Sequence, residues 1–130
     1  MKYSILREKS KAFAIRIIRM YQWLTKEKKE FILCKQCLRS GTSIGANITE
    51  GLNAQSTSDF LAKLYISLKE ANETNYWLEL LYETEYIDKK KFDSMNKDCL
   101  ELIKLLTSII KTTKRNNQLY ISKNAINYKF

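Results

Sequence analysis

The sequence lacks proline and histidine entirely, and its three glycines all lie between positions 41 and 51. Because proline and glycine are the residues that most often interrupt a helix, their scarcity predicts long helices and an all-α fold. The absence of histidine removes the commonest general base and metal ligand, so we expect a protein that is not an enzyme and has no cofactor. Glu50, Glu70 and Glu73 remain as candidate carboxylates, but helical di-metal sites also need Glu-x-x-His pairs.

Cysteine is scarce as well, and Cys34, Cys37 and Cys99 each lie within an apolar helical pattern. The Cys34-x-x-Cys37 spacing leaves a redox or zinc site open. Because there is no histidine and no second cysteine pair, we interpret all three as buried small hydrophobic residues.

Long apolar runs are also missing. No stretch approaches the roughly 18 residues that a membrane-spanning helix needs, and the first residues lack the apolar region of a signal peptide. We therefore expect a cytoplasmic protein without a membrane partner.

Positive charge dominates, but it is unevenly distributed. The net charge is +9, with +7 over residues 1–29, zero over 30–51, −4 over 52–85, +4 over 86–116 and +2 beyond. Basic ends and an acidic third quarter favour a surface that binds a polyanion, or attraction between identical subunits, and both can hold together.

Four segments show apolar residues at helical spacing, roughly residues 4–25, 31–50, 57–84 and 89–115. Gly51 is the expected C-cap of the second segment, and Asp88 the expected N-cap of the fourth, which should end at Asn116-Asn117. Short connections force antiparallel neighbours, which predicts an up-down-up-down four-helix bundle over residues 1–115. Residues 116–130 lack a helical period, and we expect a flexible or partner-dependent tail.

The stretch from Leu33 to Gly51 is the most unusual part of the chain. Its glycines allow close backbone approach, and a nearly uncharged polar stripe runs along it: Gln36, Ser40, Ser43, Asn47 and Glu50. Arg39 has no opposite charge nearby in its own helix. We predict an ion pair from Arg39 to Glu70 or Glu73 that fixes the register of the second and third helices.

The first helix interleaves basic and aromatic residues. The candidate nucleic-acid-binding residues are Lys9, Arg16, Arg19, Trp23, Lys26, Lys28 and Lys29. Lysine and arginine neutralise phosphates, but no base-reading motif accompanies them, so we expect backbone or shape recognition of RNA or DNA. A plain solvated face is the alternative. Ile5, Ile15, Ile18 and Trp23 lie off the core stripe, and we interpret this excess apolar surface as a subunit interface.

Two stretches carry a family motif. It consists of Gln36, Arg39, Ser43-Ile44 and Asn47-Ile48-Thr49-Glu50-Gly51, followed by Ser58-Asp59-Phe60, Tyr65 to Ala71, Glu73-Thr74 and Tyr76-Trp77-Leu78. On these residues the chain resembles, over about residues 4–113, the bacterial four-helix-bundle family first noted as open reading frames in intervening sequences of large-subunit ribosomal RNA genes. Ser40 and Thr49 depart from the family's usual alanines.

The resemblance implies a ring-like homopentamer with a positively charged surface. Relatives include the accessory variability determinant of diversity-generating retroelements, which binds nucleic acid and a reverse transcriptase. The sequence therefore predicts a non-enzymatic, homo-oligomeric protein that binds RNA or DNA, with a reverse transcriptase as a candidate partner. The alternative is a structural module in which the basic first helix docks on the acidic third helix of the next subunit.

Overall fold

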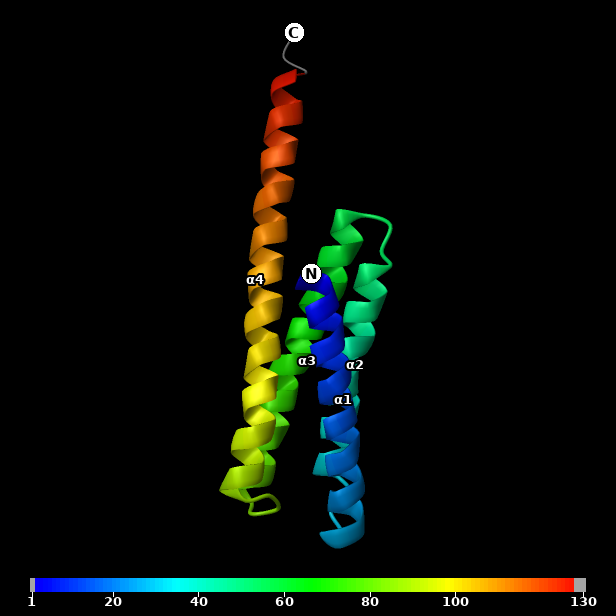
Figure 1. The fold of residues 1–130 in the computed structure, drawn as a ribbon, viewed down its shortest axis with the longest axis vertical. Helices are drawn as coiled ribbons and strands as arrows, with labels where there is room; N and C mark the ends of the chain where they lie inside the picture. Colours follow the sequence, from blue (N-terminus) through cyan, green and yellow to red (C-terminus); the bar gives the residue numbers. More distant parts are fainter. Residues whose placement is uncertain (1, 128–130) are drawn as a thin grey trace.

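The computed structural model describes residues 2–127, with side chains for residues 3–120 and for Lys123. Across this range the chain forms four α-helices: α1 (Lys2–Glu27), α2 (Leu33–Leu52), α3 (Thr57–Glu83) and α4 (Lys89–Asn127). Successive helices run antiparallel, and α4 rises beyond the other three (Figure 1). The predicted all-α, up-down-up-down four-helix bundle is confirmed. None of the described helices is both long and apolar enough to cross a membrane.

One apolar stripe from each helix fills the core. Its largest fully buried side chains include Leu6, Phe13, Ile17, Leu24, Ile44, Ile48, Leu64, Leu78, Leu81, Leu102 and Leu106. The spacing of three and four residues that predicted the helices therefore also selects what is buried. Helix α2 packs against both α1 and α3, and α3 packs against α4, whereas the contact between the neighbouring helices α1 and α4 is the smallest of the four.

Two glycines let α2 lie close against α1. A Cβ atom at Gly41 would lie 2.8 Å from Cγ1 of Ile17, and one at Gly45 would lie 3.3 Å from Oγ of Ser10. A larger residue at Gly41 would have to displace a buried side chain, so the predicted role of these glycines in close approach is confirmed.

The prediction that Gly51 caps the end of α2 is wrong. The helix continues to Leu52, and the N–H of Asn53 closes it by donating to the carbonyl of Glu50 at 3.2 Å. A Cβ atom at Gly51 would lie 3.2 Å from Cβ of Lys63 on α3. This glycine is therefore used for the approach of α3, in the same way that Gly41 is used for α1.

Glu30 caps the start of α2, which the sequence analysis did not anticipate. One carboxylate oxygen accepts the N–H groups of Ile32 at 3.0 Å and Leu33 at 2.8 Å, and the other accepts that of Cys34 at 2.7 Å. Burial opposes ionisation of Glu30, but these bonds and the Cys34 thiol outweigh it, so the pKa of Glu30 is lowered. The helix dipole favours the same negative charge.

Side-chain caps also begin the last two helices. Ser56 accepts the N–H of Asp59 at 3.1 Å and is the N-cap of α3. Asp88 accepts the N–H of Lys91 at 2.8 Å, which confirms it as the cap of α4. Each cap satisfies a backbone donor that the helix itself leaves unpaired.

Helix α4 does not end at Asn116-Asn117, contrary to the prediction. It continues to Asn127 and stands clear of the bundle (Figure 1). Asparagine lowers helix stability by less than about 1 kcal/mol relative to alanine, and this segment has no proline or glycine to stop the helix. Residues 128–130 lie outside the described part of the chain, and the partner dependence of residues 116–130 stays a prediction.

All three cysteines are free and buried, which confirms their interpretation as small hydrophobic residues. The Cys34 thiol donates to the carbonyl of Glu30 at 3.0 Å, and the Cys99 thiol donates to that of Ala71 at 3.3 Å. Burial, together with Glu30, raises the pKa of Cys34 to about 12. Burial likewise raises the pKa of Cys99 to about 12 and holds that of Cys37 above its usual range. The thiols therefore stay protonated at neutral pH.

Candidate nucleic-acid interface

Trp23 is the centre of a groove between α1 and α4. The indole is partly buried, and two ammonium groups lie over it, with Nζ of Lys28 at 5.5 Å and Nζ of Lys91 at 5.0 Å from the ring centroid. Arg16, Arg19 and Lys90 also line the groove. A cation above an aromatic face is attracted by the ring quadrupole, so the indole holds positive charge at this place. We call this site the Trp23 groove.

Two of the predicted residues connect α1 to α4. Arg16 pairs with Asp98 at 2.6 Å and also donates to Oγ of Ser94 at 2.7 Å. Lys9 pairs with Glu101 at 2.7 Å, and the hydrogen bond to Glu101 raises the pKa of Lys9. Part of the positive charge predicted for the solvent face of α1 is therefore neutralised within the chain.

The remaining predicted cations lie on the rim of the groove or outside it. Arg19 donates to Oε1 of Gln22 at 3.2 Å, and its side chain is exposed. Lys26 and Lys29 are exposed at the end of α1 and do not line the groove. The left-handed backbone of Lys29, with φ of 55°, lies in the turn that leads to α2.

The sequence analysis missed Lys90 and Lys91, because its candidate residues came from the basic and aromatic segment of the first helix alone. The signal was present as the run Lys89-Lys90-Lys91 directly after the cap residue Asp88. Three consecutive lysines in the first turn of a helix point in different directions around it, so at least one of them faces a neighbouring helix. Antiparallel packing places this first turn beside the last turns of α1.

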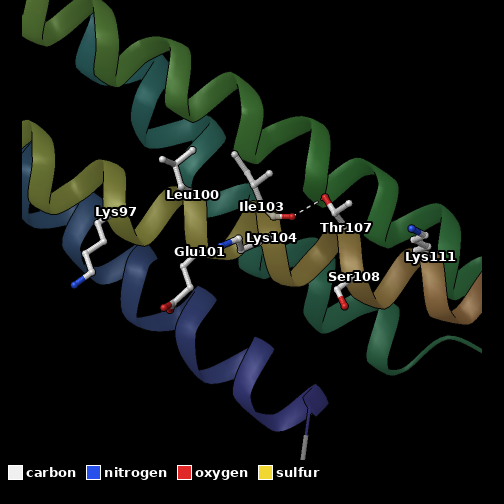
Figure 2. A pocket seen from close by; sticks show the side chains of 8 residues that line it. All are labelled: Lys97, Leu100, Glu101, Ile103, Lys104, Thr107, Ser108 and Lys111. Atoms are coloured by element: carbon white, nitrogen blue, oxygen red, sulfur yellow. Dashed lines mark hydrogen bonds between the residues drawn. The ribbon is translucent and has the colours of Figure 1, made fainter.

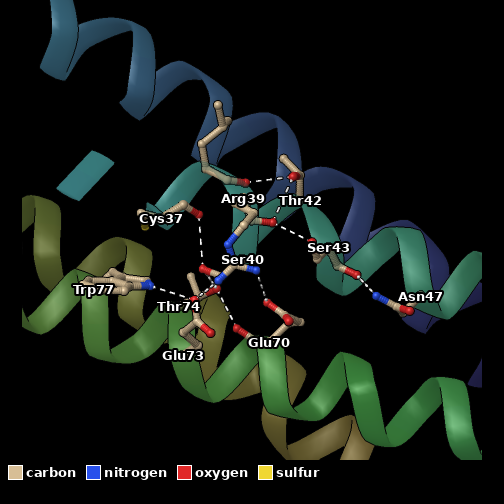
Figure 3. A network of polar contacts seen from close by, with 11 residues as sticks. Cys37, Arg39, Ser40, Thr42, Ser43, Asn47, Glu70, Glu73, Thr74 and Trp77 are labelled. Atoms are coloured by element: carbon tan, nitrogen blue, oxygen red, sulfur yellow. Dashed lines mark hydrogen bonds and ion pairs between the residues drawn. The ribbon is translucent and has the colours of Figure 1, made fainter. Parts of the chain in front are cut away.

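The predicted pairing of Arg39 is confirmed with both candidate partners. Its guanidinium donates to Glu70 at 3.2 Å and to Glu73, and Nε1 of Trp77 donates to Glu73 at 3.0 Å. Figure 3 shows these side chains meeting between α2 and α3. Deeper in the same interface, Thr74 donates to Oγ of Ser40 at 2.8 Å. The network joins the two helices in one register.

The other motif residues take part in packing and in local hydrogen bonds. Ser43 and Asn47 donate to carbonyls one turn earlier in α2, and Glu50 lies 3.7 Å from Lys63 on α3. Gln36 is exposed. These contacts give the motif a role in the α2–α3 interface and none in the Trp23 groove.

The geometry of the groove suits anion binding rather than proton transfer. Between α1 and α4 it offers guanidinium and ammonium groups beside an aromatic ring, and no carboxylate lines this part. The adjoining hollow at Trp23, which Lys28 lines, also contains Glu85 and Asp88. In the described part of the chain, no three cysteine or carboxylate side chains gather closely enough to hold a metal ion. Such a groove can bind phosphate through its cations and a planar ring through its indole.

Residues 2–108 match the family described as 23S rRNA-intervening sequence protein. The chain belongs to this family. Among solved structures it is similar to a protein of unknown function from the S23 ribosomal protein family of Bacteroides thetaiotaomicron. The two are 58% identical and superpose with a TM-score of 0.84 over 85% of this chain and 99% of that one. No curated protein matches the chain.

Membership of the family confirms the resemblance drawn from the second and third helices, whereas the link to the retroelement accessory protein stays a prediction. The family match contains the whole of the Trp23 groove and ends within α4 at residue 108. The later part of α4, from residue 109 to Asn127, lies beyond it.

Proposed function

We propose that the chain is a non-enzymatic protein that binds RNA or DNA, and that the Trp23 groove is its primary contact. One observation supports this most strongly: the ammonium groups of Lys28 and Lys91 lie within 5.5 Å of a single indole, and two arginines line the same groove as Lys91. Proteins that bind nucleic acid without reading its sequence combine these two elements, cations for phosphates and aromatic rings for bases.

The charges in the groove are available for a ligand. Lys28 has no ion pair among the described residues, and Lys91 reaches Asp88 only at 3.9 Å, with both side chains more than half exposed. An exposed pair at this distance contributes little stability, so a phosphate can replace it at small cost. Arg16 is already held by Asp98, and it would act mainly by shaping the groove.

Self-assembly belongs to the same proposal. Ile5, Ile15 and Ile18 on α1 are 42%, 48% and 39% exposed, which is more apolar surface than a monomeric helix normally shows. We propose that these residues contribute to a homo-oligomer, for which the family resemblance favours a pentamer, and that a reverse transcriptase is a candidate partner. Light scattering of the wild type and of an Ile15→Lys variant tests the interface, because the variant should dissociate.

One observation favours the alternative, a structural interaction module. Glu79, Glu83 and Glu85 are all exposed at the end of α3, and a second copy could place its basic α1 against them. Assembly that salt disrupts, in a protein that does not bind polyanions, would support this alternative.

Fluorescence anisotropy of labelled RNA and DNA strands, across a salt series, tests nucleic-acid binding. The groove variant Lys28→Gln/Lys91→Gln should bind more weakly than the wild type and lower the salt slope of log affinity by about 1.4. The matched control Lys35→Gln/Lys69→Gln removes the same charge from exposed positions on α2 and α3 and should bind normally. Equal affinity of the two variants would contradict the assignment of the groove.

A further inference from the structure

Four lysines form a row along the outer face of α4. Lys90, Lys97, Lys104 and Lys111 recur every seven residues, and all four are exposed. Seven residues complete nearly two helical turns and advance about 10.5 Å, so the row keeps to one face over about 31 Å. We call this set the lysine row.

The charge of the lysine row is not compensated within the described part of the chain, where none of its four members has an ion pair. The acidic residues nearest to it on α4 are already engaged: Asp93 with Lys89, Asp98 with Arg16, and Glu101 with Lys9. Glu101 is also the last acidic residue of the sequence, and residues 102–130 contain six lysines or arginines. The row therefore differs from a solvated helix face with alternating charge.

Three grooves follow one another along the row. The Trp23 groove includes Lys90, and the groove in Figure 2 lies along the outer face of α4 and includes the other three lysines of the row. A third groove, between α3 and α4, is lined by Tyr65, Lys111, Lys114 and Arg115. Lys111 lines both the second and the third groove. The first and second grooves share no residue and are connected by the seven-residue step from Lys90 to Lys97 along the row.

An aromatic ring stands at each end of this path. Trp23 marks the first end, and Tyr65 marks the second, where it is 45% exposed and Nζ of Lys114 lies 5.9 Å from its ring centroid. The two ends of the path therefore have the same arrangement, an accessible aromatic ring with an ammonium group above it. Base stacking on such rings, joined by a basic path for the backbone, is typical of sites that bind single strands.

We infer that the lysine row guides one single strand of nucleic acid from the Trp23 groove to Tyr65, an inference that rests on the proposed function. A strand can follow a straight row of cations over its whole length. Each strand of a duplex instead turns away and returns to the same side only after about 34 Å. At about 3.4 Å for each stacked nucleotide, the row matches about nine nucleotides.

The far end of the path lies partly outside the family match, which contains Tyr65 and stops at residue 108. Lys111, Lys114 and Arg115 follow that point, on the part of α4 that leads into its extension.

The test compares two triple variants of the full chain that lose the same charge. The row variant is Lys97→Gln/Lys104→Gln/Lys111→Gln, and the control variant is Lys11→Gln/Lys35→Gln/Lys69→Gln, all at exposed positions. Fluorescence anisotropy measures binding of labelled oligouridylates of about five and about 15 nucleotides, and of a duplex of the longer length. For the longer strand, the row variant should lower the salt slope by about 2 and weaken binding at least about tenfold near 0.1 M salt. The control variant should change neither quantity.

Strand length provides a second readout. A strand of about five nucleotides spans about 17 Å, roughly half the length of the row, so it cannot reach from the Trp23 groove to Tyr65. The row variant and Tyr65→Leu should therefore leave binding of the short oligouridylate nearly unchanged. The longer strand reaches Tyr65, and Tyr65→Leu should weaken its binding at least about fivefold. Equal losses at both lengths would overturn the path.

Failure of the inference can be distinguished from failure of the proposed function. A wild type that binds no oligonucleotide at low salt overturns both. If Lys28→Gln/Lys91→Gln weakens binding but the row variant does not, only the path is wrong. Two further results would overturn the path. One is a duplex that binds as tightly as the single strand. The other is binding of phosphatidylserine vesicles by the wild type but not by the row variant.

Discussion

The two edges of the bundle use the same residue types for different purposes. Between α2 and α3, Arg39, itself half exposed, meets two carboxylates, of which Glu70 is only 10% exposed, and Thr74 and Ser40 bond beneath them. The contact between α1 and α4 is the smallest of the four between neighbouring helices, and the ion pair of Arg16 with Asp98 leaves both side chains about 40% exposed. A closed polar network stabilises register, whereas an open edge leaves charge and an indole accessible to a ligand.

The largest difference between the edges should appear when the same substitution is made at each. Ile44→Ala, in the core beside α3, should lower the free energy of unfolding by about 2 to 5 kcal/mol, because it removes buried methyl groups and leaves a cavity. Ile15→Ala, at a position that is 48% exposed on α1 of a single chain, should change it by less than about 0.5 kcal/mol in the monomer, and by more where the proposed homo-oligomer covers α1. Urea unfolding followed by circular dichroism measures both, and similar losses would mean that α1 is covered in solution.

The two arginine pairs offer a sharper comparison. A double-mutant cycle of Arg39→Ala with Glu70→Gln should give a coupling energy of about 1 to 2 kcal/mol, because the carboxylate is shielded from water. The same cycle for Arg16 and Asp98 should give about 0.5 kcal/mol or less, since solvent screens an exposed pair. Equal couplings would contradict the distinction between a closed and an open edge.

The cap of α2 predicts a pH effect. Because the pKa of Glu30 is lowered from its ordinary value of 4.5, folding favours the ionised carboxylate. This stabilisation is complete above pH 4.5 and is lost as pH falls through the lower pKa of the folded state. Glu30→Gln should therefore cost about 1 kcal/mol at pH 7, and the difference from wild type should shrink below pH 4.5.

The matched control for this pH effect is Glu27→Gln, which removes the same charge from an exposed position in the last turn of α1. Its difference from wild type should be small at every pH. A Glu30→Gln variant whose destabilisation is as large at pH 3 as at pH 7 would show that the lost contact is not the ionised one.

The smallest effect on stability is expected from removing the end of α4. Leu119 and Tyr120 are 64% and 66% exposed, so this part of the helix adds little to the core. A chain that ends at Gln118 should unfold within about 0.5 kcal/mol of the full chain, as measured by thermal and urea unfolding. A larger loss would mean that the extension packs against another copy.

The sequence was sufficient to predict the core and the main polar contact of the fold. Apolar spacing identified the buried stripes because burial repeats with the helical period, and the isolated charge of Arg39 identified the pair with Glu70 and Glu73. Glu30 was missed because a carboxylate that caps a helix from three residues before its first residue looks like any charged loop residue. The end of α4 escaped because asparagine weakens a helix without stopping it.

The candidate interface was only half visible from the sequence. Trp23 and its neighbours on α1 could be found as a basic and aromatic segment, but the lysines of α4 become part of the same surface only through antiparallel packing. The pairing of Arg16 with Asp98 could not be foreseen, since the two lie 82 positions apart. Seven-residue spacing of lysines was the signal that would have drawn attention to α4.

The most direct test of the account is the fluorescence of Trp23 during titration with a single-stranded oligonucleotide. The chain has two tryptophans, so Trp77→Phe leaves Trp23 as the only indole. The account predicts that its emission changes saturably on binding and recovers as salt is raised, because a base stacks on the ring and phosphates replace the contacts of Lys28 and Lys91. Binding detected by anisotropy while the emission of Trp23 stays constant would contradict it.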